Sequence, residues 1–389
     1  MTAPEAGTPP AASALARLKA QFERREREVA VVFFTGGFVF DVLTTGRIDS
    51  WFTLAQQAGY LALVMAVLMH LFLEQGARVA EAPAGAPAAV PALAAFAGRV
   101  VDGYREYRSA AIHFSLGALL NLYAIFFFKS SSLLVSFGFL AVLIALLVAN
   151  ESRRFKALGL PVKFAMLALC CLSFAAIVVP IAVGSIGLGV FLGSMLAGAL
   201  PPAAAAAWVI RRRPALARAA RRQIGLPAAA VLVAFLAAYL LRVIPPVPLS
   251  IPFIGVYHSV ERSEAGYVLS HQRPWWRFWQ NGDQEFRAQP GDRVYVYFRV
   301  FSPARFADRV RMRWYWEPGG RGWLPQDTIP IAIVGGRAEG FRGYGYKDNY
   351  QPGRWKVEVQ TTDGREIGRV YFTIESVAPE PRLFEVDLD

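Results

Sequence analysis

The chain has 389 residues, of which 55% are hydrophobic and 18% are charged, and its net charge is +12. Residues 1–255 carry 22 Lys and Arg against 11 Asp and Glu, whereas residues 256–389 carry 19 against 18. Because the positive excess lies between apolar runs, it is typical of membrane orientation, and we expect no nucleic-acid partner.

Apolar runs dominate the first two thirds of the chain. A helix needs about 20 mostly apolar residues to cross a lipid bilayer. Runs of this kind lie at residues 29–45, 51–73, 112–128, 133–150, 161–183, 188–210 and 226–243. They predict an α-helical integral membrane bundle of about seven transmembrane helices over residues 29–245, with the lipid bilayer as its partner.

The bundle is predicted to have three parts after a cytoplasmic N-terminal segment, residues 1–28. A helical hairpin spans residues 29–73. Residues 74–111 contain an Ala/Pro-rich stretch and then apolar and charged residues at helical spacing, which predicts a linker and an amphipathic helix on the membrane surface. Five further helices span residues 112–245.

Basic residues between the apolar runs indicate the orientation. With the N-terminus inside, the segments on the inner side hold 19 Lys and Arg. The outer side and its margins hold only Arg47, Lys129 and Arg242. Cytoplasmic loops carry the excess of Lys and Arg, so the N-terminus is predicted to be cytoplasmic and the C-terminal domain to lie on the opposite side.

The last apolar run ends in a proline-rich strip with four prolines in residues 245–252. Proline cannot continue a helix, and its ring restricts the backbone to extended or turn conformations. We therefore predict that residues 246–252 form a stiff, extended spacer between the bundle and the following domain.

After residue 253, apolar residues alternate with polar ones at the period of a β-strand. The apolar sets are Val294, Val296, Phe298 and Val300, then Val310, Met312, Trp314 and Trp316, and then Trp355, Val357 and Val359. Lys356 and Glu358 alternate with the last set and are expected on the wet face. The pattern predicts an all-β, immunoglobulin-like sandwich of seven or eight strands over residues 253–376.

Two glycine-containing pairs, Gly335-Gly336 and Asp363-Gly364, are predicted to be hairpin turns between such strands. Prolines and acidic residues are frequent in residues 377–389. We predict that they form a loosely held C-terminal tail.

Four segments of this part of the chain resemble a bacterial family known as domain of unknown function 2914. The segments are IPPVPLS (244–250), GVYHSV (255–260), GGRAEGFRGYGYKDN (335–349) and PGRWKVEVQTTDGREIG (352–368). The resemblance implies a protein of the bacterial inner membrane with a periplasmic C-terminal domain. It implies no catalytic residues.

Aromatic and basic residues are interleaved in HQRPWWRFWQNGDQEF, residues 271–286. The candidate ligand-binding residues are Arg273, Trp275, Trp276, Arg277 and Trp279. Consecutive aromatic residues of a strand cannot all face one core, so at least one ring should be exposed. The rings either pack on the sandwich or enter the outer leaflet, where Trp is favoured, or they stack on sugar rings or a peptide while the arginines bind anionic groups.

Three ionisable residues of the apolar runs, Asp41, His70 and His113, are candidate intramembrane polar sites. Charged groups inside a membrane are costly and often functional, so a proton or ion relay is one interpretation. The other is that Asp41 pairs with Arg47 or extends to the surface, and that both histidines lie at the cytoplasmic interface.

The polar C-terminal part has His258 and His271, no cysteine, and none of the common hydrolase motifs. We interpret His258 as structural, with a ligand or acid–base role as the alternative. The nearby Asp283, Glu285 and Asp292 are typical of a surface turn, with a carboxylate pair for glycoside hydrolysis as the alternative. No catalytic set, metal site or cofactor is expected.

The favoured functional hypothesis is a non-enzymatic module. The periplasmic sandwich would bind or sense an envelope component, such as a glycan, or a periplasmic or membrane protein partner. One alternative is a membrane-embedded enzyme or transporter that uses Asp41, His70 and His113, and a second is a structural subunit of an envelope assembly.

Overall fold

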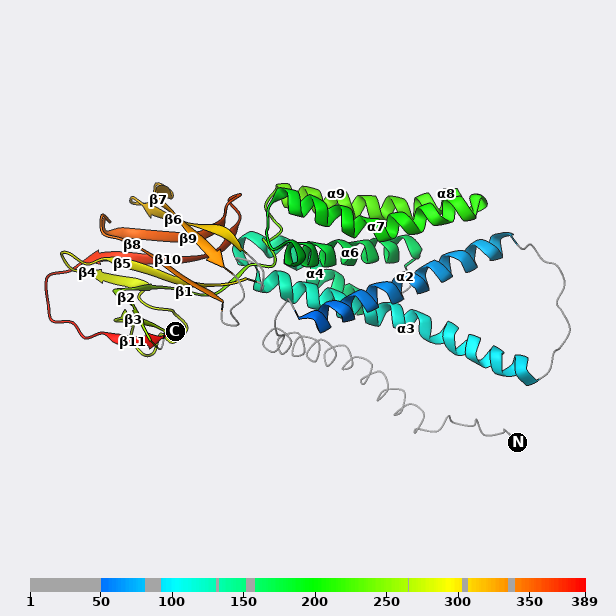
Figure 1. Cartoon of the computed structure of the whole chain (residues 1–389), viewed down its shortest axis with the longest axis horizontal. Coiled ribbons are helices and arrows are strands. Elements are labelled where there is room, and N and C mark those ends of the chain that lie inside the picture. The colour runs from blue at the N-terminus through cyan, green and yellow to red at the C-terminus, as the bar shows by residue number, and fades with distance from the viewer. Residues whose placement is uncertain are drawn as a thin grey trace, which may run out of the picture. The chain divides into compact units, whose positions relative to one another are not determined.

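The computed structural model describes residues 50–80, 92–130, 133–151, 158–264, 266–302, 307–334 and 340–389. Helices make up the N-terminal part of these residues and strands the C-terminal part, as predicted (Figure 1). The predicted cytoplasmic segment, the first predicted span with Asp41, and most of the Ala/Pro-rich linker lie outside the described residues.

The helices are α2 (Trp51–Ala80), α3 (Ala92–Lys129), α4 (Leu133–Glu151), α6 (Leu160–Val183), α7 (Leu188–Arg212), η1 (Pro214–Leu216), α8 (Ala217–Ala220), η2 (Arg221–Gly225) and α9 (Leu226–Leu240). Five helical stretches of the described chain are long and apolar enough to cross a membrane: Trp51–Ala77, Ala111–Phe128, Leu160–Val183, Leu188–Arg212 and Pro214–Leu240. The apolar helix within α4, Gly138–Asn150, is shorter. The described structure therefore supports five spans by length and composition, and not seven.

One predicted boundary within the bundle is wrong. The separation of a surface helix from a span near residue 111 does not occur, because α3 runs without interruption from Ala92 to Lys129. No proline interrupts this stretch, so its backbone hydrogen bonds can continue. Helix α9 begins at Leu226, as predicted for the last span, and the short helical segments η1, α8 and η2 lead directly into it.

Glycine permits a close approach between α6 and α7. A Cβ atom at Gly198 would lie 2.8 Å from the Cα atom of Leu172 and 2.9 Å from the carbonyl oxygen of Cys171. The two helices can therefore approach at this point only because residue 198 has no side chain.

Eleven strands lie in the described residues of the C-terminal part, more than the seven or eight predicted. They are β1 (Ser250–Tyr257), β2 (Ser259–Ser263), β3 (Gly266–His271), β4 (Glu285–Ala288), β5 (Val294–Phe301), β6 (Ala307–Glu317), β7 (Leu324–Val334), β8 (Phe341–Lys347), β9 (Gly353–Thr361), β10 (Glu366–Ser376) and β11 (Glu385–Leu388). They form a three-stranded sheet β1-β5-β8, a five-stranded sheet β4-β10-β9-β6-β7 and a small sheet β11-β3-β2. All strand pairs are antiparallel except β4 with β10.

The apolar sets predicted from alternation form the core of the sandwich. The four residues of β5, three of the four of β6 and all three of β9 belong to one buried cluster. Trp316 is partly buried and packs against it. Full burial of such side chains contributes about 1.5–3 kcal/mol each, so this cluster is the main apolar contribution to the sandwich.

The expectation that Lys356 and Glu358 face water is wrong. Both are buried, and Lys356 Nζ lies 2.6 Å from Glu358 Oε1. The same ammonium lies 4.4 Å from the ring centre of Tyr315 and 5.1 Å from that of Trp323. Aromatic rings therefore cover the outer face of β9, which strand periodicity cannot reveal because the rings come from other strands and loops.

The predicted turn at Asp363-Gly364 is confirmed, with the Gly364 N–H donating to the Thr361 carbonyl at 3.0 Å. The turn predicted at Gly335-Gly336 lies outside the described residues.

The prediction of a loosely held tail is wrong. Residues 385–388 form β11, which pairs antiparallel with the edge of β3. Asp389 Oδ2 accepts a hydrogen bond from the Tyr297 hydroxyl at 2.5 Å, and Asp389 Oδ1 lies 3.1 Å from Arg299 Nη1. Backbone pairing and charge hold this end, while Val386 and Leu388 remain exposed.

The proline-rich strip is also not an extended spacer. Residues 244–250 are all buried, and the N–H groups of Val247 and Leu249 donate to the carbonyls of Pro245 and Pro246 at 2.9 and 3.0 Å. The chain forms turns here because Ile244, Val247 and Leu249 gain more by burial than an extended strip would allow.

Candidate functional site

Four aromatic rings lie exposed on the segment between β3 and β4, and we call residues 274–280 the aromatic loop. The exposed fractions are 83% for Trp275, 48% for Trp276, 80% for Phe278 and 62% for Trp279. Trp276 and Phe278 both contact the ring of Trp279, at centroid distances of 6.0 and 5.3 Å. These rings are not part of the buried cluster that forms the sandwich core.

Hydrogen bonds give the aromatic loop a defined shape. The N–H groups of Arg277 and Gln280 donate to the carbonyls of Pro274 and Arg277, each at 3.0 Å. The Arg273 guanidinium donates to the Gln280 carbonyl across the base of the loop. Arg277 Nη1 also lies 2.8 Å from Glu285 Oε1 at the start of β4.

A polar groove of about 300 Å³ lies beside the loop. Its lining residues are Gln272, Arg273, Pro274, Arg277, Gln280, Gly282, Asp283, Gln284, Glu285, Arg287, Glu375 and Leu383. The structure therefore brings the predicted ligand residues Arg273 and Arg277 into one groove. It does not bring Trp275, Trp276 and Trp279 into the lining.

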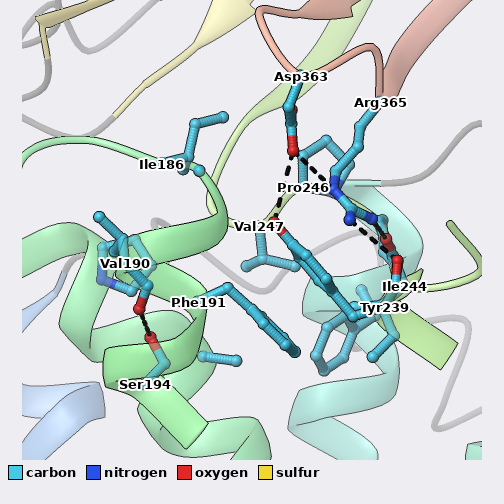
Figure 2. A pocket seen from close by; sticks show the side chains of 15 residues that line it. Ile186, Val190, Phe191, Ser194, Tyr239, Ile244, Pro246, Val247, Asp363 and Arg365 are labelled. Atoms are coloured by element: carbon cyan, nitrogen blue, oxygen red, sulfur yellow. Dashed lines mark hydrogen bonds and ion pairs between the residues drawn. The ribbon is translucent and has the colours of Figure 1, made fainter. Parts of the chain in front are cut away.

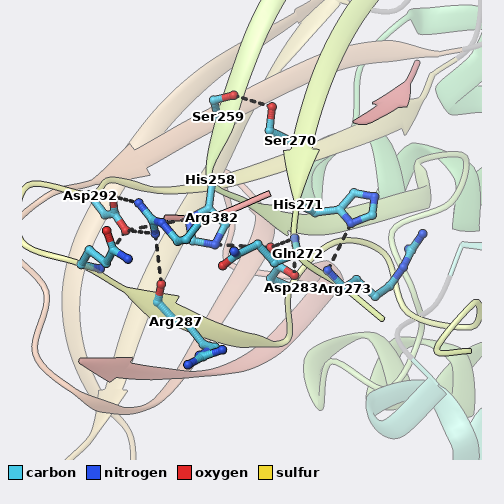
Figure 3. Close-up of polar contacts among 11 residues, drawn as sticks. His258, Ser259, Ser270, His271, Gln272, Arg273, Asp283, Arg287, Asp292 and Arg382 are labelled. Carbon is cyan, nitrogen blue, oxygen red and sulfur yellow. Dashed lines mark hydrogen bonds and ion pairs between the residues drawn. The ribbon is translucent and has the colours of Figure 1, made fainter. Parts of the chain in front are cut away.

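A polar cluster around His258 shares Gln272 and Asp283 with the lining of the groove (Figure 3). His258 Nε2 is 3.5 Å from Asp283 Oδ2, and His258 Nδ1 is 3.9 Å from Asp292 Oδ2. The imidazole stacks on the ring of Phe286 at a centroid distance of 4.0 Å. Both oxygens of Asp283 accept the backbone N–H of Gln272, at 3.0 and 2.8 Å.

Burial sets the protonation states of this cluster. It lowers the pKa of His258 to about 4, with the nearby Arg382 acting in the same direction. It raises the pKa of Asp283 to about 6, against the opposing hydrogen bond from Gln272. At neutral pH, His258 is therefore uncharged, so the 3.5 Å contact joins a neutral imidazole to a carboxylate and is not an ion pair.

Arg382 holds Asp292 in the same cluster. Its two terminal nitrogens lie 2.6 and 2.8 Å from the two oxygens of Asp292. Burial raises the pKa of Asp292, but these bonds and one from the Gln289 N–H outweigh it, so the pKa lies below its usual value. The sequence placed the acids of this region together but could not identify Arg382, which lies 90 residues further along.

The geometry favours the structural interpretation of His258. Its side chain is only 5% exposed, and it lies against the rings of both Phe286 and Phe384. A substrate in the groove would meet Asp283 and Gln272 first, because they line the groove and His258 does not. Within the ranges described above, no group of three or more His, Cys, Asp and Glu side chains is arranged to hold a metal ion.

His271 connects the base of the aromatic loop to the C-terminal strand. Its Nε2 lies 3.3 Å from Asp387 Oδ2 on β11, and its Nδ1 accepts the backbone N–H of Arg273 at 3.2 Å. The neighbouring Arg273 Nη2 lies 3.8 Å from the same carboxylate. Strand β11 therefore supports the arginine that shapes the groove.

Of the three intramembrane candidates, the structure describes His70 and His113. Asp41 lies outside it. His113 is buried and its Nδ1 lies 2.8 Å from Asn150 Oδ1, while Asn150 Nδ2 donates to the His113 carbonyl at 2.8 Å. His70 has an exposed side chain on α2. The partner Asn150 was not anticipated, although an amide at the end of an apolar helix is a usable signal.

A second polar contact joins the sandwich to the last helix, and sequence reasoning missed it (Figure 2). Arg365, just after the Asp363-Gly364 turn, donates from Nη2 to the Tyr239 carbonyl at 2.9 Å. Its guanidinium carbon lies 3.4 Å from the centre of the Tyr239 ring. On the other side of that ring, Phe191 of α7 stacks at 3.6 Å. The same carbonyl accepts the N–H of Arg242 at 3.0 Å, so Arg365 supplies its second hydrogen bond at the end of α9.

Fold and site together define a chain of apolar helices followed by a β-sandwich with a polar groove. Residues 307–374 match the family model described as "Protein of unknown function (DUF2914)". This confirms the family resemblance for the segments 335–349 and 352–368, whereas the aromatic loop and the groove lie outside the matched residues. A comparison with curated proteins finds no match.

Several solved structures are similar to parts of the chain. An immunoglobulin-like protein from Pseudomonas aeruginosa is 14% identical, with 33% of this chain and 98% of that one covered and a TM-score of 0.21. A β-glucosidase from Listeria innocua in complex with glucose is 12% identical, with 24% and 15% covered and a TM-score of 0.18. A DNA glycosylase, AlkC, from Pseudomonas fluorescens is 12% identical, with 84% and 99% covered and a TM-score of 0.21.

Proposed function

We propose that this chain is a protein of the bacterial inner membrane, with its N-terminus in the cytoplasm and its sandwich in the periplasm. Five described helices have the length and composition of membrane spans. The asymmetry of Lys and Arg between the apolar runs supports the orientation. The run at 29–45 and the shorter helix α4 would complete seven spans and bring the sandwich to the outer side.

We further propose that the sandwich is a non-enzymatic module that binds an envelope glycan in the polar groove. The lining of the groove carries this proposal. Its arginine and glutamine side chains can donate hydrogen bonds, and its glutamines and carboxylates can accept them. Ligand pockets are usually mostly apolar, so a groove lined in this way suits a ligand rich in hydroxyl groups, which both donate and accept.

The three arginines of the groove are balanced by three carboxylates, Asp283, Glu285 and Glu375. This balance favours a neutral or zwitterionic ligand over a strongly anionic one, because a fixed acid would repel an anion at short range. The sandwich would then hold the glycan outside the membrane, and the bundle would anchor the complex.

Binding of purified, full-length protein in lipid nanodiscs to an array of bacterial envelope oligosaccharides tests the proposal. Arg287 lines the groove and has an exposed side chain, so Arg287→Ala should leave the fold intact. The loss of one charged hydrogen bond, about 1.5–3 kcal/mol, should weaken binding by roughly tenfold or more.

Arg354→Ala is the matched control, because Arg354 is 66% exposed on β9, where it pairs with Glu317, and does not line the groove. The proposal fails if no envelope oligosaccharide binds the wild-type protein, or if the two variants bind equally well. Capture of a periplasmic protein by the groove in place of an oligosaccharide would identify the sandwich as a protein-binding module instead.

A further inference from the structure

We infer that the four exposed rings of the aromatic loop lie in the headgroup layer of the same membrane that α9 crosses, and that they dock the sandwich on the lipid surface. This inference rests on the proposed membrane location of the helices. It concerns side chains that do not line the groove, so it is separate from the binding of a glycan there.

The direction of the chain places the loop at the end of the sandwich that adjoins the last helix. Gly282 forms a parallel bridge with Val256 of β1, and Asn281 Nδ2 donates to the Ile254 carbonyl at 3.3 Å. Because the bridge is parallel, the residues before Gly282 lie beside the residues before Val256. The aromatic loop therefore extends back along β1 toward Ser250.

That end of β1 is close to the predicted membrane surface. Strand β1 begins at Ser250, ten positions after α9 ends at Leu240. Ile254 is four positions further on, which corresponds to about 13 Å of strand. The aromatic loop runs back from Ile254 toward Ser250 over part of this length. The polar layer outside the hydrocarbon core is about 5–8 Å thick on each side, so rings that extend beyond Ile254 toward Ser250 can reach it.

The chemistry of the loop fits a lipid interface. Indole rings favour the boundary between hydrocarbon and headgroups, because they combine a large apolar surface with one N–H donor. Three of the four rings are indoles, and all four point away from the core. The Arg277 guanidinium lies 4.8 Å from the centre of the Trp276 ring, where it can also approach lipid phosphates.

The loop is already shaped before any lipid binds. Its two internal turns, the bond from Arg273 to the Gln280 carbonyl and the ion pair of Arg277 with Glu285 restrain the backbone that carries the rings. Docking would therefore require little ordering, and a rigid anchor of this kind would hold the adjoining groove close to the membrane surface.

Quenching of Trp fluorescence by brominated phosphatidylcholine in nanodiscs tests the inference on the full-length protein. The Trp fluorescence of the wild type minus that of the triple variant Trp275→Phe, Trp276→Phe, Trp279→Phe gives the signal of the three loop indoles. We expect this difference signal to lose intensity when the bromines lie near the glycerol end of the acyl chains, and much less when they lie near the chain ends.

Two further residues provide controls. Trp323 lies beside Arg354 at the start of β9. The other end of β9 leads to the turn that contacts α9, so Trp323 lies at the end of β9 that is farther from this contact. Its signal, isolated with Trp323→Phe, should not be quenched. Trp208 belongs to α7, one of the apolar helices, and its signal should be quenched.

The outcomes separate the two proposals. If Trp208 is quenched and the loop indoles are not, the docking inference is overturned while the membrane location stands. If neither is quenched, the membrane location itself is wrong, and the docking inference falls with it. Quenching of the loop signal but not of the Trp323 signal supports the inference.

Discussion

The contact of Arg365 with the end of α9 yields a sharp prediction, because a single side chain makes most of it. Arg365 is 9% exposed, and its guanidinium donates to the Tyr239 carbonyl, lies on the Tyr239 ring and pairs with Asp363 at 3.0 Å. Replacement by Ala removes all three interactions at once. We expect the junction between the sandwich and the last helix to loosen while both parts stay folded.

The size of the effect follows from the geometry. One charged hydrogen bond contributes about 1.5–3 kcal/mol. A desolvated cation–π contact adds about 1–2 kcal/mol. The bond to Asp363 adds little, because that carboxylate is 33% exposed and water can replace the arginine. A net loss of about 3 kcal/mol corresponds to a roughly 100-fold rise in local opening.

Hydrogen exchange of the amides in residues 241–249, measured by mass spectrometry on full-length protein in nanodiscs, reports this opening. Arg365→Ala should accelerate the exchange by roughly 100-fold, and Arg365→Lys should fall between it and wild type, since lysine keeps the charge but loses the planar fork. Arg354→Ala should leave these amides unchanged. If Arg365→Ala exchanges at the wild-type rate, the contact does not hold the junction and the reasoning is wrong.

Three other predictions concern the sandwich, each measured as unfolding of the full-length protein. The pKa of His258 is lowered from 6.5 to about 4, so the free energy of unfolding increases as the pH rises through that interval. The pKa of Asp283 is raised from 3.8 to about 6, so the free energy of unfolding decreases as the pH rises through that interval. These two pH dependences oppose each other, so Asp283→Asn should make the melting temperature rise more steeply between pH 4 and 6.5. An unchanged dependence of the melting temperature on pH would show that the pKa of the Asp283 carboxyl is not perturbed. Trp355→Ala should cost about 3–5 kcal/mol, because its ring is 1% exposed and packs on Trp314, and a loss below about 1 kcal/mol would contradict the assigned core. At Gly282 a Cβ would lie 1.9 Å from the Val256 carbonyl oxygen, so Gly282→Ala should destabilise the aromatic loop more than Gly291→Ala, where φ is also positive but no atom lies within 4 Å.

Several parts of the site could be predicted because they depend on contiguous residues. The aromatic loop was recognisable as a candidate since consecutive rings cannot all enter one core, and four exposed side chains confirm that reasoning. Arg273 and Arg277 were candidates on the same stretch, and they line one groove. Most other lining residues belong to the same stretch, residues 271–286, whereas Arg287, Glu375 and the supporting Arg382 lie outside it.

The order of the chain, with apolar helices before an alternating β-domain, was determined by the sequence itself, because hydrophobic period and run length are local properties. The strands of the core were determined in the same way. Only the tertiary structure decided which polar residues meet, such as Arg365 with Tyr239, or His271 with Asp387 of the C-terminal tail. It also decided that Lys356 is covered and that the proline strip is folded into turns. These outcomes depend on contacts between residues far apart in the chain, which local periodicity does not encode.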